Sequence, residues 1–265
     1  MKFEKIGFIG CGNMGGAIAK VCAGKGELYL ANRTAAKAET LAARICGHAV
    51  DNQTVASTCD LIFLGVKPQM MQDMLTGIAP ILAKRSDRFV LVSMAAGLEM
   101  STIAEMAGGD YPIIRIMPNT PVAVGEGVVQ FCTVGVTEAE QAAFEELLKD
   151  AGKVDTLPEQ LIDAASALSG CGPTFVYPIM EAMADGAVAC GLPRGKAMEY
   201  AAQTLIGAGK LMLASDKHPG ALKDAVCSPA GSTIQGVRVL EERAVRGAMM
   251  DAVIAAFEKN KQLGK

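Results

Sequence analysis

The segment Ile6–Ile18, IGFIGCGNMGGAI, joins a short apolar run to a group of glycines and then to residues with helical spacing. Its centre, GCGNMG at Gly10–Gly15, has the spacing of a dinucleotide-binding turn between a strand and a helix. Such glycines allow a tight turn and the close approach of a pyrophosphate, which the first amides of the helix then bind. An ordinary glycine-rich turn is the alternative. At this place in the chain, the motif predicts a cofactor-binding α/β domain.

The chain from residue 4 to about 135 alternates short apolar runs with longer amphipathic runs. This alternation is typical of strand–helix units on a parallel sheet. The short runs predict strands at 6–10, 28–32, 61–66, 89–94, 113–117 and 128–132. The longer runs predict helices over NMGGAIAKVCAGKG, AAKAETLAARIC, PQMMQDMLTGIAPILA, MSTIAEMAG and TEAEQAAFEELLKDAG, the last of them ending at Gly152. The predicted fold class is α/β, with an N-terminal Rossmann domain on a doubly wound, mostly parallel sheet.

The pattern changes after the segment KVDTLPEQ, where strand-like runs stop and Ala, Met and Leu dominate the rest of the chain. We therefore predict a dinucleotide-binding Rossmann domain over residues 1–158 and an all-helical domain over residues 159–265. The predicted helices are apolar on more than one face, and a lone bundle of this size does not bury so much apolar surface. A homodimer that covers these faces is the expected arrangement, with the helical domain serving both dimerisation and substrate binding.

The composition limits the classes of partner. The 265 residues carry a formal net charge of -3, so the broad positive field of a nucleic-acid-binding protein is missing. We expect a small-molecule substrate, and neither nucleic acid nor a membrane as a partner. The segment MKFEKIGFIG runs directly into a strand without the pattern of a cleavable signal, which predicts a cytoplasmic protein.

The cysteines and histidines limit the chemistry. The eight cysteines include no C-x-x-C pair, and the two histidines are His48 and His218. This usage predicts thiols buried as small hydrophobic residues in a reducing compartment. No metal site is expected, and a Ser-His-Asp arrangement has few candidates.

The end of the second predicted strand bears on the choice of cofactor. A turn that selects NAD usually carries Asp or Glu there, against the 2′-hydroxyl of the ribose. This chain instead has Asn32, Arg33 and Thr34. Without a carboxylate, a 2′-phosphate is not repelled, and Arg33 can bind it with the two neighbouring polar groups. NADPH is the predicted cofactor, with NADH as the second choice; the alternative is that Arg33 is only a solvated charge.

Two more loops follow the third and fourth predicted strands, where open sheets bind their ligands. They are LGVKPQ at 64–69 and SMAAGL at 93–98. The first forms a rigid turn with one cation, Lys67, and the second offers the small residues Ala95 and Ala96 to a nicotinamide ring. Equally, Lys67 can be a surface charge and the small residues can serve packing.

A second glycine turn, SPAGSTIQG at Ser228–Gly236, lies close to the end of the chain. Gly231 permits close approach of the backbone, and Ser232 or Thr233 starts a helix whose free N–H groups face an anion. We expect the first glycine turn to bind the cofactor phosphates and the second to bind a substrate carboxylate. The alternative is a helix start without a ligand.

Seven segments, read in order, resemble the pyrroline-5-carboxylate reductases: GCGNMG, GVKPQ, VSMAAG, RIMPNTP, LSGCGP, MADGAVACGLPR and HPGALKDAVCSPAGSTIQGVRVLEE. The resemblance runs over essentially all 265 residues. Its last segment is the most specific one, because few other Rossmann proteins carry such a turn there. The usual family form is SPGGTT or SPGGAT, and this chain has Ala230 and Ser232 instead while Ser228, Gly231 and Thr233 match.

The resemblance implies the last step of proline biosynthesis, in which a hydride passes from NADPH or NADH to the C=N carbon of 1-pyrroline-5-carboxylate. It also implies a homodimer interleaved through the helical domain, often assembled into a decamer of five dimers. It assigns to the cofactor Ile9, Gly10, Cys11, Gly12, Asn13, Met14, Gly15, Asn32, Arg33, Thr34, Asn52, Gly65, Val66, Lys67, Pro68, Met94, Ala95 and Ala96. The substrate-binding assignments are Glu159, Ser228, Gly231, Ser232 and Thr233.

Imine reduction needs a hydride donor in near contact and an electron-poor carbon, which a hydrogen bond at the ring nitrogen helps to supply. Thr233 is the residue to which we assign this bond, and it is the predicted catalytic residue. A β-hydroxyacid-dehydrogenase-like NADP enzyme is one alternative, but the first lysine after Gly172 is Lys196, too late for the lysine that such enzymes use. A non-catalytic NADP(H)-binding sensor is the other, and it has no need of the second turn.

Overall fold

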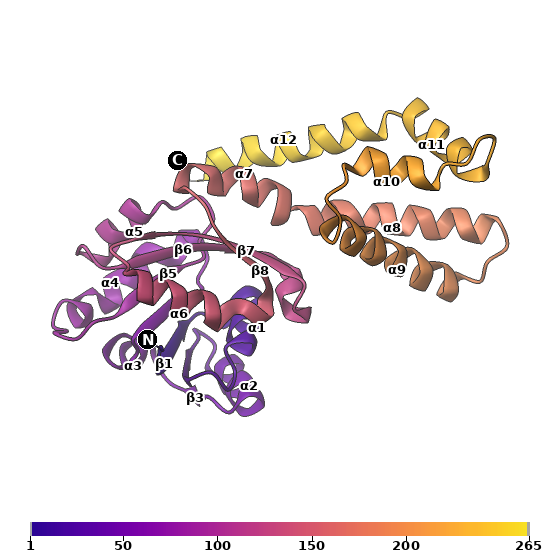
Figure 1. The fold of residues 1–265 in the computed structure, drawn as a ribbon. Coiled ribbons are helices and arrows are strands. Elements are labelled where there is room, and N and C mark those ends of the chain that lie inside the picture. The colour runs from indigo at the N-terminus through magenta and orange to yellow at the C-terminus, as the bar shows by residue number, and fades with distance from the viewer. Residues whose placement is uncertain (1, 264–265) are drawn as a thin grey trace. The chain divides into compact units, whose positions relative to one another are not determined.

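A computed structural model describes residues 2–263 and divides the chain into two compact units. The first is an α/β unit that runs to Cys171 and also takes in residues 256–263 of the described chain. The second is a helical unit, Gly172–Ala255. The boundary expected from sequence lies a little earlier, before the first helix of the predicted helical domain. Figure 1 shows the elements of both units, most of them labelled.

The α/β unit is built on one sheet of eight strands in the order β3-β2-β1-β4-β5-β6-β7-β8. Neighbouring strands are parallel except β6 and β7, which are antiparallel. A doubly wound, mostly parallel sheet followed by helices confirms the predicted fold class. The strands are β1 Lys5–Ile9, β2 Glu27–Ala31, β3 His48–Ala49, β4 Leu61–Leu64, β5 Val90–Ser93, β6 Ile113–Pro118, β7 Gly127–Val134 and β8 Gly152–Thr156.

Helices cover both faces of this sheet. The α-helices are α1 Asn13–Val21, α2 Ala35–Ile45, α3 Asn52–Thr58, α4 Met71–Leu82, α5 Met100–Ala107, α6 Glu138–Leu148 and α7 Glu159–Ser169, with short 3-10 helices at η1 Pro68–Met70, η2 Thr120–Val124 and η3 Lys149–Ala151. One buried cluster joins α1, α2 and α6 to the sheet, and a second joins α3, α4, α5 and α7 to its other face. Successive residues of β4 alternate between the two clusters, because side chains of a strand point to opposite faces.

Three elements were not predicted from the sequence, and a fourth ends earlier than expected. The strands β3 and β8 and the helix α3 were not predicted, because each is short and largely polar or exposed. The helix expected to end at Gly152 is α6, which ends at Leu148 and is followed by the 3-10 helix η3. Gly152 has φ +124°, a conformation that other residues rarely adopt, and it begins β8 instead.

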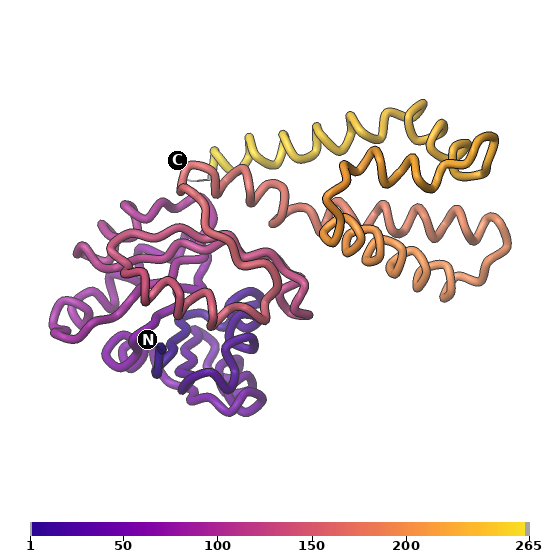
Figure 2. Tube along the Cα trace, in the orientation of Figure 1, coloured from indigo at the N-terminus to yellow at the C-terminus, as the bar shows by residue number. Residues whose placement is uncertain are grey.

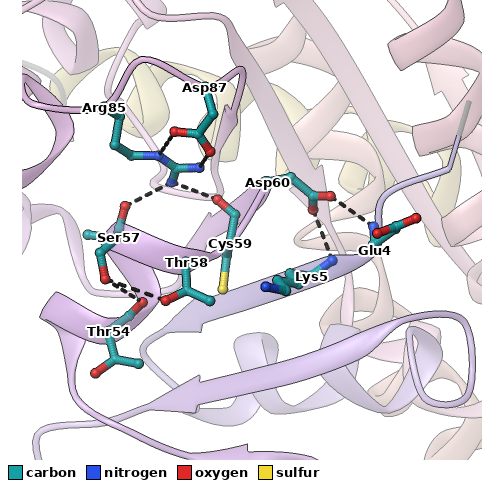
Figure 3. A network of polar contacts seen from close by, with 10 residues as sticks. Glu4, Lys5, Thr54, Ser57, Thr58, Cys59, Asp60, Arg85 and Asp87 are labelled. Atoms are coloured by element: carbon teal, nitrogen blue, oxygen red, sulfur yellow. Dashed lines mark hydrogen bonds and ion pairs between the residues drawn. The ribbon is translucent and has the colours of Figure 1, made fainter.

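Polar groups fill the edge of the sheet where β1 and β4 begin (Figure 3). The Asp60 carboxylate accepts hydrogen bonds from the backbone N–H groups of Glu4, at 2.9 Å, and Lys5, at 3.2 Å. Arg85 donates to the carbonyls of Ala56, at 2.8 Å, and Cys59, at 2.7 Å, at the end of α3. Asp60 and Arg85 thus both have hydrogen-bond partners within the protein. In an open α/β sheet, ligands bind at the other end of the strands, where the parallel strands finish.

The helical unit contains α8 Gly172–Ala189, α9 Arg194–Leu213, α10 Pro219–Val226, α11 Ser232–Glu242 and most of α12 Val245–Leu263. Figure 2 traces α8 and α9, which pack against one another. Within the described chain, the buried apolar core of this unit consists of Ala184, Ala197 and Ala201. Large apolar side chains are exposed instead, among them Tyr177, Ile206, Leu213, Leu240 and Met250. Among the described helices, none is both long and apolar enough to cross a membrane.

Candidate functional site

The turn after β1 is a close-packed arrangement of three glycines. Gly10 has φ +106°, and its backbone N–H bonds the carbonyl of Ala31 at 2.8 Å. A Cβ atom at Gly15 would lie 2.1 Å from the Gly10 carbonyl oxygen, and one at Gly65 would lie 2.3 Å from the same atom. No side chain fits at either place. The glycines therefore bring the start of α1 against the ends of β1 and β4, the two strands at which the strand order reverses.

Asn32 fixes the relative position of two turns at this edge. Its Oδ1 accepts a hydrogen bond from the Cys11 backbone N–H at 3.1 Å, and its Nδ2 donates to the Thr34 carbonyl at 3.0 Å. Both ends of the amide are thus used inside the protein. The structure gives Asn32 a positioning role in addition to the cofactor contact expected from sequence.

The start of α1 offers free hydrogen-bond donors. Its N-cap is Gly12, which has no side chain to cap the helix, and the first turn contains no acidic residue. The first N–H groups of a helix have no acceptor within the helix, and they carry part of the positive end of the helix dipole. An anion is the group that this helix start binds best.

The other residues expected at the cofactor lie around the same edge. Gly65, Val66, Lys67 and Pro68 follow β4, and Met94, Ala95 and Ala96 follow β5. Arg33 and Lys67 are exposed, and neither makes an ion pair within residues 2–263. Asn52 begins α3, one residue after the N-cap Asp51.

Three cations near this edge were not singled out from the sequence. A groove of about 610 Å³ between α1 and α2 is lined by Gly12 and Asn13 at one end and by Lys20, Lys37 and Arg44 along its walls. Of the described residues that line it, none is acidic. Lys37 and Arg44 are two helical turns apart on α2, and a search of the sequence for charges at helical spacing would have found this pair. Lys20 lies on α1, so the groove that all three cations share follows only from the packing of α1 against α2.

Glu159 has two partners inside the α/β unit. Its Oε1 accepts a hydrogen bond from the Met100 backbone N–H at 2.8 Å and pairs with Arg115 at 3.1 Å. Arg115 also pairs with Asp163 of α7 at 3.1 Å, and its side chain is only 2% exposed. A buried arginine therefore binds α7 to the sheet. The substrate contact expected for Glu159 stays a prediction.

The second glycine turn lies in the helical unit. The Gly231 N–H bonds the Ser228 carbonyl at 3.0 Å, and Ala230 has φ +60°. Gly231 is the N-cap of α11, which starts at Ser232 with no side-chain cap and no acidic residue in its first turn. Ser232 and Thr233 are exposed, and within the described chain their hydroxyls have no hydrogen-bond partner. Free N–H groups and two free hydroxyls therefore gather at one helix end.

The Cys11 thiol at this edge is poorly suited to act as a nucleophile. Burial raises the pKa of Cys11 to about 11, so the thiolate is scarce near neutral pH. Residues 2–263 also contain no group of three or more His, Cys, Asp and Glu side chains that could hold a metal ion. The donors available at the two turns are backbone amides, hydroxyls and cations.

A doubly wound sheet with a glycine turn at its switch point, followed by helices, defines the class of Rossmann-type α/β proteins. A family described as NADP oxidoreductase, coenzyme F420-dependent, matches residues 5–97, and one described as pyrroline-5-carboxylate reductase dimerisation matches residues 159–263. The pyrroline-5-carboxylate reductase of Escherichia coli K12 is 39% identical over 269 residues, 99% of each chain. The chain belongs to the pyrroline-5-carboxylate reductase family.

Other relatives and solved structures agree with this membership. The pyrroline-5-carboxylate reductase of Methanosarcina acetivorans is 38% identical over all of both chains. The crystal structure of the Plasmodium falciparum enzyme with NADP bound covers 100% of both chains, with a TM-score of 0.88 and 32% identity. The Coxiella burnetii structure has a TM-score of 0.88 and 29% identity, and covers 98% of each chain.

Proposed function

We propose that this protein reduces 1-pyrroline-5-carboxylate to L-proline, the last step of proline biosynthesis, with NADPH as the hydride donor. Family membership over the full length is the observation that carries the proposal. The chemistry of the two glycine turns supports it, because each turn offers uncapped helix N–H groups to an anion. The cofactor has phosphates and the substrate has a carboxylate.

The residues at the first turn fit a 2′-phosphorylated dinucleotide. The glycine contacts leave space only for backbone at the end of β1, and the end of β2 carries Asn32 and Arg33 in place of an acidic residue. The cofactor-binding residues are the set assigned above from Ile9 to Ala96. NADPH in its bound state supplies a hydride from its nicotinamide ring.

Thr233 is the proposed catalytic residue. Its hydroxyl hydrogen-bonds the ring nitrogen of the imine, which holds the C=N bond in place and draws electron density from the carbon. The hydride forms a new C–H bond at that carbon as the C=N π bond breaks, and the electron pair on nitrogen takes a proton that ultimately comes from water. Ser228, Gly231 and Ser232 bind the substrate carboxylate through the turn and the start of α11. Glu159 is also assigned to the substrate, in addition to its bond with Arg115.

A homodimer in the cytoplasm is the proposed working form, with assembly into a decamer as the larger alternative. The dimerisation family match and the exposed apolar side chains of α8, α9, α11 and α12 support the homodimer. A functional boundary after residue 158 is also proposed, because the dimerisation match starts at residue 159. All eight cysteines are free thiols, which fits a reducing compartment, although Cys46 and Cys190 are exposed and not buried as the sequence led us to expect.

The test is to incubate the purified protein with NADPH and pyrroline-5-carboxylate and to follow oxidation of the cofactor while quantifying proline. We expect stoichiometric proline formation. A protein that instead oxidises a β-hydroxy acid, or that binds NADPH and turns over neither compound, would overturn the proposal in favour of one of its two rivals.

A further inference from the structure

The start of α2 carries charges of the sign that a helix start disfavours. Its N-cap is Thr34, with no side-chain hydrogen bond to the helix and no acidic residue in the first turn. Arg33 stands just before this cap, and Lys37 lies within the first turn. The N-terminal end of a helix is its positive end, so cations there are destabilising and anions are stabilising.

Among the described residues, Lys37 has no ion-pair partner that would offset this unfavourable position. Within residues 2–263 it makes no ion pair, and it lines the groove between α1 and α2 in which no acidic residue is found. Other lysines of the same unit do pair, for example Lys25 with Asp150 at 2.7 Å and Lys149 with Glu146 at 2.5 Å. Within the described chain Lys84, on another surface, is unpaired as well, so it is the place of Lys37 in this groove and at the start of α2 that makes its charge available to an anion.

Two further cations line the groove, away from the start of α2. Lys20 and Arg44 stand in the last turns of α1 and α2, where a cation stabilises the helix, so each has a structural reason to be present. The seven-residue spacing from Lys37 to Arg44 corresponds to roughly 10 Å along the helix axis. At this distance Arg44 acts on an anion at the start of α2 through the field and not through contact. Lys20 stands in the last turn of the other helix, and we expect it to act in the same way.

We propose that Lys37 is a specificity-determining residue that contacts the 2′-phosphate of the cofactor, and that Lys20 and Arg44 strengthen this selection from a distance. The inference rests on the proposed use of a dinucleotide cofactor and deepens it. A phosphomonoester dianion placed at the start of α2 meets the uncapped N–H groups, Arg33 and Lys37 together. NADH lacks this phosphate and gains nothing from Lys37.

The experiment measures binding of NADP+ and NAD+ by titration calorimetry, at low and at high salt, without any imine substrate. Lys37→Met is expected to weaken NADP+ binding about 10-fold or more, the size of one charge-assisted hydrogen bond, and to change NAD+ binding by less than about twofold. Lys20→Met and Arg44→Met are each expected to weaken NADP+ binding by about two- to fourfold at low salt, and to have no effect at high salt. Lys84→Met removes an exposed lysine from another surface and is the matched control.

Two further variants separate a binding role from a structural one. Lys37→Arg keeps the charge and should keep the preference for NADP+. Lys37→Glu should abolish the preference while raising the melting temperature of the cofactor-free protein, because it places an anion at the start of α2. Adenosine 2′-monophosphate, used as a competitor, should lose affinity for the Lys37→Met variant, whereas adenosine 5′-monophosphate should not.

Equal losses for NADP+ and NAD+, or no loss for either, in the Lys37→Met variant would overturn the inference. These binding measurements are independent of the reaction. If the protein does not reduce pyrroline-5-carboxylate but the Lys37→Met variant loses affinity for NADP+ and not for NAD+, the inference stands and the proposed function is wrong. If the protein forms proline but the Lys37→Met variant prefers NADP+ over NAD+ as strongly as the parent does, the proposed function stands and the inference about Lys37 is wrong.

Discussion

The two glycine turns start helices in the same way but are held very differently. In the turn at Gly12, the backbones of Gly10, Gly15 and Gly65 leave no space for a side chain, and Asn32 bonds the turn to its neighbour. In the turn at Gly231, the residues around the glycine are exposed, and the nearest atom to an added Cβ is the Ser228 carbonyl oxygen at 3.1 Å.

The same contrast holds for the units around them. The α/β unit buries two large apolar clusters on its sheet, whereas the helical unit buries three alanines. The first turn is therefore preorganised by its own domain. The second is built from local backbone alone, and the side chains that surround it are left for a ligand or a partner subunit. The effects of mutations should differ accordingly.

The largest effect is expected for Gly15→Ala. The new Cβ would lie 2.1 Å from the Gly10 carbonyl oxygen, so β1 and α1 would have to separate. We expect a loss of stability of about 3 kcal/mol or more, measured by urea denaturation, or failure to fold. Gly12→Ala is the matched control, because nothing lies within 4 Å of its added Cβ. Equal stabilities of the two variants would show that the backbone around Gly15 has space for a side chain, contrary to the structure.

Thr233→Ala tests the chemistry of the second turn. Loss of one hydrogen bond to the reacting imine should lower kcat/KM by roughly 10- to 1000-fold, since such a bond contributes about 1.4 to 4 kcal/mol in the transition state. The melting temperature should not change, because the hydroxyl has no partner within the described chain. Thr233→Ser should retain most of the activity. Unchanged kinetics in the alanine variant would remove Thr233 from the mechanism.

Arg115→Met tests how strongly the α/β unit is held together by buried charge. The variant leaves Glu159 and Asp163 without the cation that both face, and it should cost about 2 to 4 kcal/mol in urea denaturation. The control lies in the helical unit, where Arg238 pairs with Glu242 on the surface. Arg238→Met should cost less than about 1 kcal/mol. Similar losses from the two substitutions would contradict the contrast between the units.

Acid should weaken the α/β unit through Glu140. A hydrogen bond from Arg88, with further bonds from Thr137, lowers the pKa of Glu140 from 4.5 to about 2. A carboxylate whose pKa is lower in the folded protein than in the unfolded chain stabilises the fold at pH values above its unfolded-state pKa. This stability is lost as the pH falls toward its folded-state pKa. Denaturation midpoints should therefore decline between pH 4.5 and pH 2. Glu140→Gln should be less stable at neutral pH, and a decline as steep as that of the parent would exclude Glu140 as the cause.

The smallest effect is expected for Gly231→Ala. Gly231 has φ -72°, which any residue adopts, and its added Cβ needs only a small shift of the Ser228 carbonyl. We expect KM for the substrate to rise by less than about tenfold and stability to change by less than about 1 kcal/mol. A loss as large as that of Gly15→Ala would mean that the second turn is as closed as the first.

Much of the α/β unit could be predicted because its central strands are buried on both faces and therefore read as continuous apolar runs. The missed elements lack this signal: β3 has two exposed residues, and β8 lies at the edge of the sheet. For the site, the glycines were visible because few other residues satisfy such contacts. Lys37 was not noticed because a lysine in a helix is ordinarily a solvated charge.

The sequence by itself determined the class of fold, the two glycine turns and the family, because these depend on local backbone requirements and on motifs of fixed spacing. Only the tertiary structure decided which distant groups meet. It brought Arg115 of β6 under the acidic residues of α7, joined Asn32 to the turn at Cys11, and placed Lys20, Lys37 and Arg44 along one groove. Such contacts depend on how helices and strands pack, and the spacing of residues along one element does not determine which other elements it packs against.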